Sequence, residues 1–139
     1  MAARFYPGLV RLFLVRHAQA EPGHPDELRP LTPAGREQAR ALGERLAAAS
    51  PAVVLSSPLL RARETAAAIA RATGAELRVD DRLAPGATLV GLLGAADGLG
   101  EPLVAVGHQP DCGEIAAALT GVAPPAYPPA GVAELDLPL

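Results

Sequence analysis

Residues 9–18 read LVRLFLVRHA, an aliphatic run that ends in an arginine and a histidine followed by alanine. A nearly continuous apolar run of this length is typical of a strand that is buried on both faces. Ala52–Ser56 (AVVLS) and Leu103–Val106 (LVAV) have the same character, and Leu77–Val79 predicts a further strand. Strands buried on both faces need helices on both sides of the sheet, so these runs decide the fold class.

Helical patterns occupy the segments between these strands. Thr32 followed by Pro33 predicts a helix start, with a threonine N-cap and a proline at the first helical position. Small and apolar residues then recur at helical spacing and predict the face that packs on the sheet, namely Gly35, Ala39, Leu42, Gly43 and Leu46. Further helices are expected over residues 57–73, 89–93 and 111–120, the last with Asp111 as its cap.

The C-terminal part of the chain completes the pattern. The proline-rich residues 123–129 predict a loop, and Val132–Leu137 alternates like an edge strand. Strand–helix alternation with short connections predicts one α/β domain over residues 1–139, a three-layer α/β/α sandwich with a mostly parallel sheet.

Composition narrows the classes of protein to consider. The chain has 139 residues, of which 50% are hydrophobic, a formal net charge of -3 and one cysteine. A negative net charge argues against a nucleic-acid partner, because contacts to a phosphate backbone need a basic surface. The lone Cys112 excludes an internal disulfide and fits a reducing compartment. The sequence carries no signal-peptide pattern and no membrane-length apolar stretch, so we expect a cytoplasmic location without membrane contact.

Reactive side chains follow three of the predicted strands. Arg16 and His17 come after the first strand, Ser57 and Arg61 after the second, and His108 after the Leu103–Val106 strand. Ligands of parallel sheets bind beyond the carboxyl ends of the strands, so these residues are expected to meet at one edge. Two arginines suit a phosphate dianion, and a neutral imidazole is a competent nucleophile toward phosphorus.

These blocks resemble the signature motifs of the histidine phosphatase superfamily, whose fold is described as phosphoglycerate mutase-like. LFLVRHAQA resembles its strand–Arg–His signature, although Ala18 stands where the usual RHG form has glycine. SSPLLRARETA and AVGHQPD resemble its second-arginine and second-histidine blocks. RPLTPAGREQA and the overall length are similar to the short bacterial phosphohistidine phosphatases of the SixA type, which lack the insertions of phosphoglycerate mutases.

The resemblance covers nearly the whole chain and implies a role for each matching residue. His17 would be the phosphorylated nucleophile, and Arg16 and Arg61 would bind the phosphate. His108 would be the second pocket histidine, donating to the phosphoryl oxygens. The resemblance implies a metal-independent hydrolase with no cofactor, acting on a phosphorylated protein or a small phosphorylated metabolite.

One family feature is absent from the sequence. Many members carry a Glu or Asp before the second-histidine strand to protonate the leaving group, whereas the matching stretch LAPGATLVG has no acid. The nearby acids do not match the family position: Asp80, Asp81, Asp97 and Glu101. An imidazole leaving group needs less help than an alkoxide, which favours phosphohistidine as substrate. The alternatives are a small-molecule phosphomonoesterase and a non-catalytic phosphate-binding module on the same fold.

The remaining candidate residues have modest predicted roles. Gln19 is expected at the rim of the site, bonded to the loop, and Ser57 is expected either at the substrate rim or as a helix N-cap. His24 is expected to be a solvated loop residue, and Cys112 is expected to be a small buried apolar side chain. The three histidines show no ligand spacing for zinc. A monomer or a weak dimer is expected.

Overall fold

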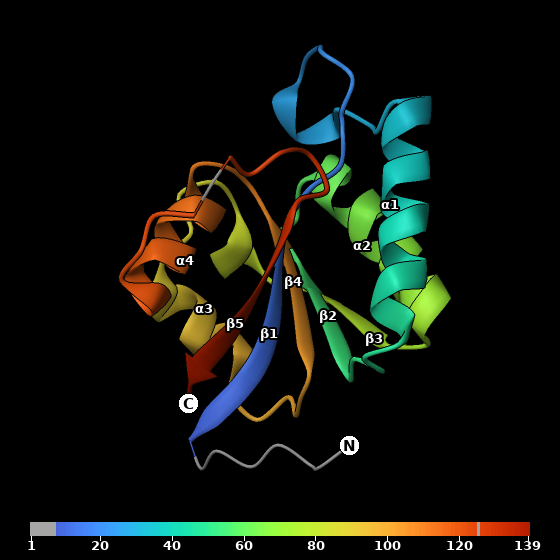
Figure 1. The fold of residues 1–139 in the computed structure, drawn as a ribbon. Coiled ribbons are helices and arrows are strands. Elements are labelled where there is room, and N and C mark those ends of the chain that lie inside the picture. The colour runs from blue at the N-terminus through green and yellow to red at the C-terminus, as the bar shows by residue number, and fades with distance from the viewer. Residues whose placement is uncertain (1–7, 125) are drawn as a thin grey trace.

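The fold is a five-stranded sheet between two helical layers (Figure 1), and the computed structural model describes residues 8–124 and 126–139. The strands are β1 (Leu9–Arg16), β2 (Val53–Ser56), β3 (Glu76–Val79), β4 (Leu103–Gly107) and β5 (Val132–Pro138). Their order in the sheet is β3-β2-β4-β1-β5. The first four are parallel, and β5 pairs antiparallel with β1. The predicted α/β fold with a mostly parallel sheet is confirmed.

Helices cover both faces of this sheet. The helices α1 (Pro33–Ala47) and α2 (Leu60–Thr73) lie on one face, and α3 (Leu89–Ala96) and α4 (Asp111–Thr120) lie on the other (Figure 1). Alternate residues of β1 point to opposite faces of the sheet and belong to two separate hydrophobic cores, one on each face. Leu12 and Leu14 pack with the layer of α3 and α4, whereas Phe13 and Val15 pack with the layer of α1 and α2. This double burial is the reason that β1 is apolar at every one of these positions.

The helix α1 begins as the sequence predicts. Thr32 is the N-cap, and its hydroxyl oxygen accepts a hydrogen bond from the backbone N–H of Gly35 at 2.8 Å. The predicted inner face is confirmed, because its five residues are the buried ones: Gly35, Ala39, Leu42, Gly43 and Leu46.

The predicted start of α2 and the predicted cap of α4 are wrong. The helix α2 begins at Leu60 with Leu59 as its N-cap, so Ser57 lies in the turn before the helix. The helix α4 spans Asp111–Thr120, as predicted, but Pro110 and not Asp111 is its N-cap. The Asp111 carboxylate instead accepts hydrogen bonds from the backbone N–H groups of Gly86 and Ala87, at 2.8 and 3.1 Å.

The other elements deviate little from expectation. The helix α3 continues to Ala96, three residues beyond the predicted end, because Ala95 and Ala96 also pack in the core. The strand β3 lies at the sheet edge with all four residues exposed. Cys112 is buried, as predicted, and His24 is exposed. None of the helices within the described residues combines the length and the hydropathy needed to cross a bilayer.

Candidate active site

The carboxyl ends of β1, β4 and β2 lie level at one edge of the sheet. The register pairs Arg16 with Gly107, and Ser56 with Val106. The residues that follow these strands are therefore neighbours in space, and the rings of His17 and His108 lie with their centroids 5.3 Å apart. The backbone continues the pairing past the strand ends, since the His17 N–H donates to the Gly107 carbonyl at 2.9 Å.

The backbone around His17 determines which ring nitrogen carries the proton. Nδ1 of His17 lies 2.7 Å from the carbonyl oxygen of Ala18, which can only accept, so Nδ1 is the donor. In the neutral ring Nε2 then keeps its lone pair. Ala18 is held in turn, because it is fully buried and its N–H donates to the Thr65 hydroxyl at 3.0 Å.

The charge state of His17 follows from its surroundings. Burial lowers the pKa of the ring below its ordinary value, although the hydrogen bond to the Ala18 carbonyl opposes this shift. The positive charges of Arg61 and Arg16 lower the pKa further. The ring is therefore uncharged at neutral pH, which is the state that a nucleophilic nitrogen requires.

The two arginines come from different elements, Arg16 from the end of β1 and Arg61 from α2. Arg16 donates from Nη1 to the Tyr127 carbonyl at 3.0 Å, and its Nε is buried without a hydrogen-bond partner in the described part of the chain. Arg61 lies in the first turn of α2 with only 8% of its side chain exposed. Buried guanidinium N–H groups that the protein leaves unpaired are suited to an anionic ligand.

Asp26 is a site neighbour that sequence reasoning missed. It belongs to the short 3-10 helix η1 (Asp26–Leu28), and it accepts from Arg61 through both its backbone oxygen, at 2.9 Å, and its carboxylate, at 3.2 Å. The same carboxylate pairs with Arg29 at 3.0 Å. The bonds to Arg29 and Arg61 lower the pKa of Asp26, so it remains ionised at neutral pH. Only the folded path of the loop brings it to Arg61, which no local pattern indicates.

His108 is almost completely buried, with 4% of its surface exposed. Its Nε2 lies 2.7 Å from the hydroxyl oxygen of Ser57, and its Nδ1 has no partner among residues 8–124 and 126–139. Burial lowers the pKa of His108 to about 4, with His17 and Arg61 adding to the shift. The ring is neutral at physiological pH, and its buried Nδ1 is left without a hydrogen-bond partner in the described residues.

The remaining sequence candidates are now placed. Ser57 is fully buried and bonded to His108, so it lies beneath the site and not on an exposed rim. Gln19 is exposed, and its side-chain oxygen accepts from the Thr32 hydroxyl at 2.9 Å, which is the predicted bond to the loop. Asp111 holds the loop at Gly86, as described above.

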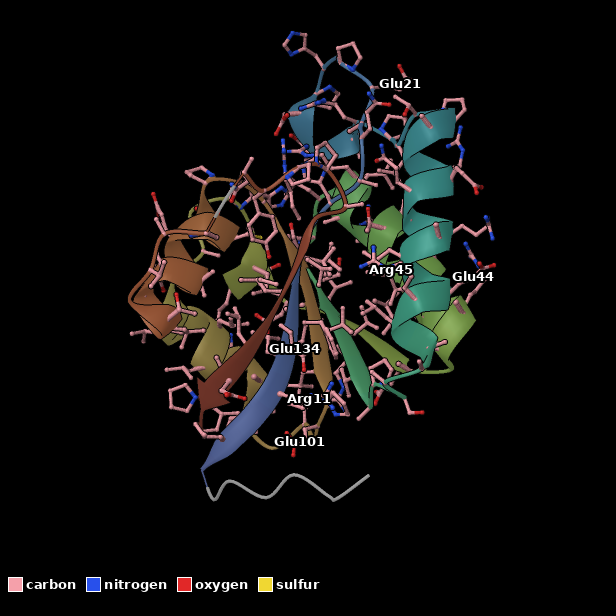
Figure 2. All side chains as sticks on the ribbon, viewed as in Figure 1. Arg11, Glu21, Glu44, Arg45, Glu101 and Glu134 are labelled. Atoms are coloured by element: carbon pink, nitrogen blue, oxygen red, sulfur yellow. The ribbon has the colours of Figure 1, made fainter. Side chains whose placement is uncertain are left out.

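Two of the four acids near the missing family position, Asp80 and Glu101, have partners elsewhere. Asp80 forms an ion pair with Arg82 at 2.8 Å. Glu101 accepts from the Arg11 backbone N–H at 2.6 Å. Figure 2 shows Glu101 and Arg11 near the start of β1, at the end of the sheet opposite the loop that carries Glu21. In the described residues no group of three or more His, Cys, Asp or Glu side chains is arranged to hold a metal ion.

Comparisons with known proteins agree with this geometry. Residues 12–85 match the model of the histidine phosphatase superfamily (branch 1). Among curated proteins, "Probable phosphoglycerate mutase GpmB" of Salmonella choleraesuis is 35% identical over 82 residues, which are 54% of this chain and 37% of that protein. "Putative phosphoserine phosphatase 2" of Hydrogenobacter thermophilus is 41% identical over 80 residues, 52% of this chain and 38% of that protein. The chain thus spans well under half the length of these relatives.

Solved structures cover far more of the chain. The "putative phosphohistidine phosphatase SixA" of Agrobacterium tumefaciens superposes with a TM-score of 0.78 at 29% identity, covering 91% of both chains. The protein histidine phosphatase SixA complexed with tungstate gives a TM-score of 0.78 at 24% identity, covering 90% of this chain and 86% of that one. The second likeness is evidence of a shared fold alone. The family match over more than half the sequence places this chain in the histidine phosphatase superfamily, branch 1.

Proposed function

We propose that this protein is a phosphatase that transfers a phosphoryl group from its substrate to Nε2 of His17 and then to water. One observation carries the proposal: the Ala18 carbonyl accepts a hydrogen bond from Nδ1–H of the neutral His17 ring, so Nε2 has a lone pair beside His108. A nucleophile flanked by buried cations suits an attack on an anionic phosphoryl group.

The first step forms a bond between Nε2 of His17 and phosphorus while the bond from phosphorus to the leaving group breaks. Arg16 and Arg61 offset the negative charge on the equatorial oxygens. His17 becomes positively charged as it is phosphorylated, and its Nδ1–H bond to the Ala18 carbonyl strengthens in compensation. The leaving group departs with a proton supplied by solvent.

The second step releases the phosphate. A water oxygen attacks phosphorus, the bond from phosphorus to Nε2 breaks, and the water gives up a proton as inorganic phosphate forms. The ring of His17 returns to its neutral state. Arg16 and Arg61 bind the phosphoryl oxygens in both steps, so the charged groups of the site do not have to rearrange between the steps.

Phosphohistidine on a protein is the substrate that we propose. Of the acids beside the missing family position, Asp80 and Glu101 are engaged elsewhere. Asp26 is held ionised by Arg29 and Arg61, so it has no proton to donate at neutral pH. An imidazole leaving group, with an ordinary pKa of about 6.5, can depart with a solvent proton, whereas an alkoxide cannot. The SixA name of the structural neighbour supports the same class. We propose that the enzyme acts in the cytoplasm.

A phosphomonoester of a small metabolite is the second candidate. The curated relatives carry the names of a phosphoglycerate mutase and a phosphoserine phosphatase, which act on such compounds by name. This candidate requires a proton donor for the alkoxide, which would be a solvent molecule or a group of the substrate itself.

Turnover of three substrates separates these candidates. The substrates are para-nitrophenyl phosphate, a phosphohistidine peptide and phosphoserine, and we expect kcat/KM for the peptide to exceed that for phosphoserine. The His17→Ala variant should be inactive on all of them, while the control His24→Ala, at an exposed loop position, should keep wild-type rates.

Two results would contradict the proposal. A strong preference for phosphoserine would overturn phosphohistidine as the substrate class. Wild-type protein as inert as His17→Ala, with inorganic phosphate still bound, would establish a non-catalytic phosphate-binding module.

A further inference from the structure

A buried serine and a buried histidine meet beneath the proposed phosphate site. Ser57 follows β2 and His108 follows β4, and the two residues are 0% and 4% exposed. The pairing of Ser56 with Val106 sets the ends of the two strands level. It brings the Ser57 hydroxyl oxygen to 2.7 Å from Nε2 of His108. The phosphatase mechanism described above assigns no task to this contact.

Counting hydrogen bonds shows which partner is the donor. The Ser57 oxygen already accepts from the backbone N–H of Leu59 at 3.2 Å, and within the described residues its hydroxyl proton has one acceptor in reach, Nε2 of His108. If His108 donated instead, a fully buried hydroxyl proton would have no acceptor. The opposite arrangement leaves only Nδ1–H of His108 without a partner in the described residues, and a bound phosphoryl oxygen would satisfy that donor, so the Ser57 O–H is assigned as the donor to Nε2.

The consequence for His108 is a defined tautomer. A neutral imidazole has one N–H, and an Nε2 that accepts leaves the proton on Nδ1. Nδ1 is also the ring nitrogen that has no partner in the described part of the chain. An N–H in this position donates to an anion, whereas the other tautomer would present a lone pair and repel it.

We propose that Ser57 is a positioning residue that locks His108 in its Nδ1–H tautomer, so that a neutral ring donates a hydrogen bond to a bound phosphoryl group. The idea rests on the proposed phosphatase function for its catalytic consequence, but the tautomer is independent of activity. It explains how His108 can bind an anion without being charged, next to His17 and Arg61, which disfavour a further cation.

The tautomer can be read directly by nitrogen NMR. The chain has three histidines, so a ¹⁵N-labelled sample gives three ring spin systems, and His108→Gln identifies one of them. At neutral pH we expect the wild-type His108 ring to show a protonated Nδ1 and an unprotonated Nε2. A wild-type ring with the proton on Nε2 would overturn the proposal.

The Ser57→Ala variant tests the cause. We expect the His108 signals to shift toward the Nε2–H tautomer, and kcat/KM for para-nitrophenyl phosphate to fall about 10-fold to 100-fold. Inorganic phosphate should bind more weakly. The matched control is Ser56→Ala, which removes the adjacent buried hydroxyl, whose bond runs to the Ser57 carbonyl and not to His108. This control should keep the wild-type tautomer and rates.

The outcomes separate the two proposals. A Ser57→Ala protein that keeps the Nδ1–H tautomer refutes the role of Ser57, whatever the activity. A wild-type protein that shows the expected tautomer, and loses it in Ser57→Ala, supports the role of Ser57 even if phosphatase turnover proves absent.

Discussion

Among the glycines of the described residues, Gly35 leaves the least room for a Cβ, and it lies against Gln19, two residues after the proposed nucleophile. A Cβ at this position would lie 2.0 Å from the Gln19 carbonyl oxygen, 2.9 Å from the carbon of the same carbonyl and 3.1 Å from the Gln19 nitrogen. All three are backbone atoms, so no side-chain rotation can relieve the contact. A Gly35→Ala variant must therefore separate α1 from the loop after β1 by more than 1 Å to reach an ordinary contact of 3.4 Å.

The size of the effect follows from two opposing contributions. Overpacking of this kind costs about 1–3 kcal/mol. Replacing a helical glycine by alanine returns up to about 1 kcal/mol. We expect Gly35→Ala to be about 1–2 kcal/mol less stable than wild type. Gln19 also adjoins Ala18, whose carbonyl orients His17, so displacing this loop should lower kcat/KM about 10-fold to 100-fold.

The control is Gly43→Ala on the same face of the same helix. Its Cβ would lie 2.9 Å from the Ala72 Cβ and 3.0 Å from the Ala68 carbonyl oxygen, so it should lose stability as well. It should keep its kcat/KM, because α2 and not the His17 loop receives the strain. Urea unfolding followed by circular dichroism and para-nitrophenyl phosphate turnover measure the two effects. A Gly35→Ala protein with wild-type stability and rate would refute the reasoning.

Three further predictions concern pH, charge and thiol reactivity. The pKa of His108 lies at about 4 in the folded state and near 6.5 in the unfolded state. As the pH drops, the unfolded chain therefore binds the proton first, and the free energy of unfolding should fall between about pH 6.5 and pH 4. Urea midpoints at several pH values should show a shallower fall in His108→Gln, and an equally steep fall would contradict the assignment. Asp26→Asn removes the carboxylate on Arg61 and should tighten competitive inhibition by inorganic phosphate about two- to fivefold, with Glu27→Gln as control; weaker inhibition would show that Asp26 instead supports Arg61. Burial raises the pKa of the Cys112 thiol to about 12, so iodoacetamide should neither label the native protein nor inhibit it, and rapid native labelling would contradict the structure.

The fold and the positions of the main site residues are predictable from the sequence because both depend on local patterns. An aliphatic run predicts a buried strand whatever the rest of the chain does, and the end of such a strand marks the edge where ligands bind. The placement of His17 and His108 at one edge of the sheet is therefore predictable from the sequence. The inner face of α1 was predictable for the same reason, because helical spacing alone defines it.

The features that sequence reasoning missed depend on contacts between distant segments. Ser57 and Asp111 each have a side chain that also suits a helix N-cap, and the local pattern could not show that His108 and the loop at Gly86 compete for them. Asp26 lies 35 residues from Arg61, in a loop whose course no periodicity defines. When a polar side chain has several possible partners, the tertiary structure determines which of them it bonds to.

Trapping the phosphorylated protein tests the central claim most directly. Wild-type enzyme is mixed with a ³²P-labelled phosphodonor, quenched under denaturing alkaline conditions that preserve phosphohistidine, digested and mapped by mass spectrometry. The account predicts an acid-labile phosphate on His17, absent from His17→Ala and present in His24→Ala. A label on any other residue, or full turnover by His17→Ala, would contradict it.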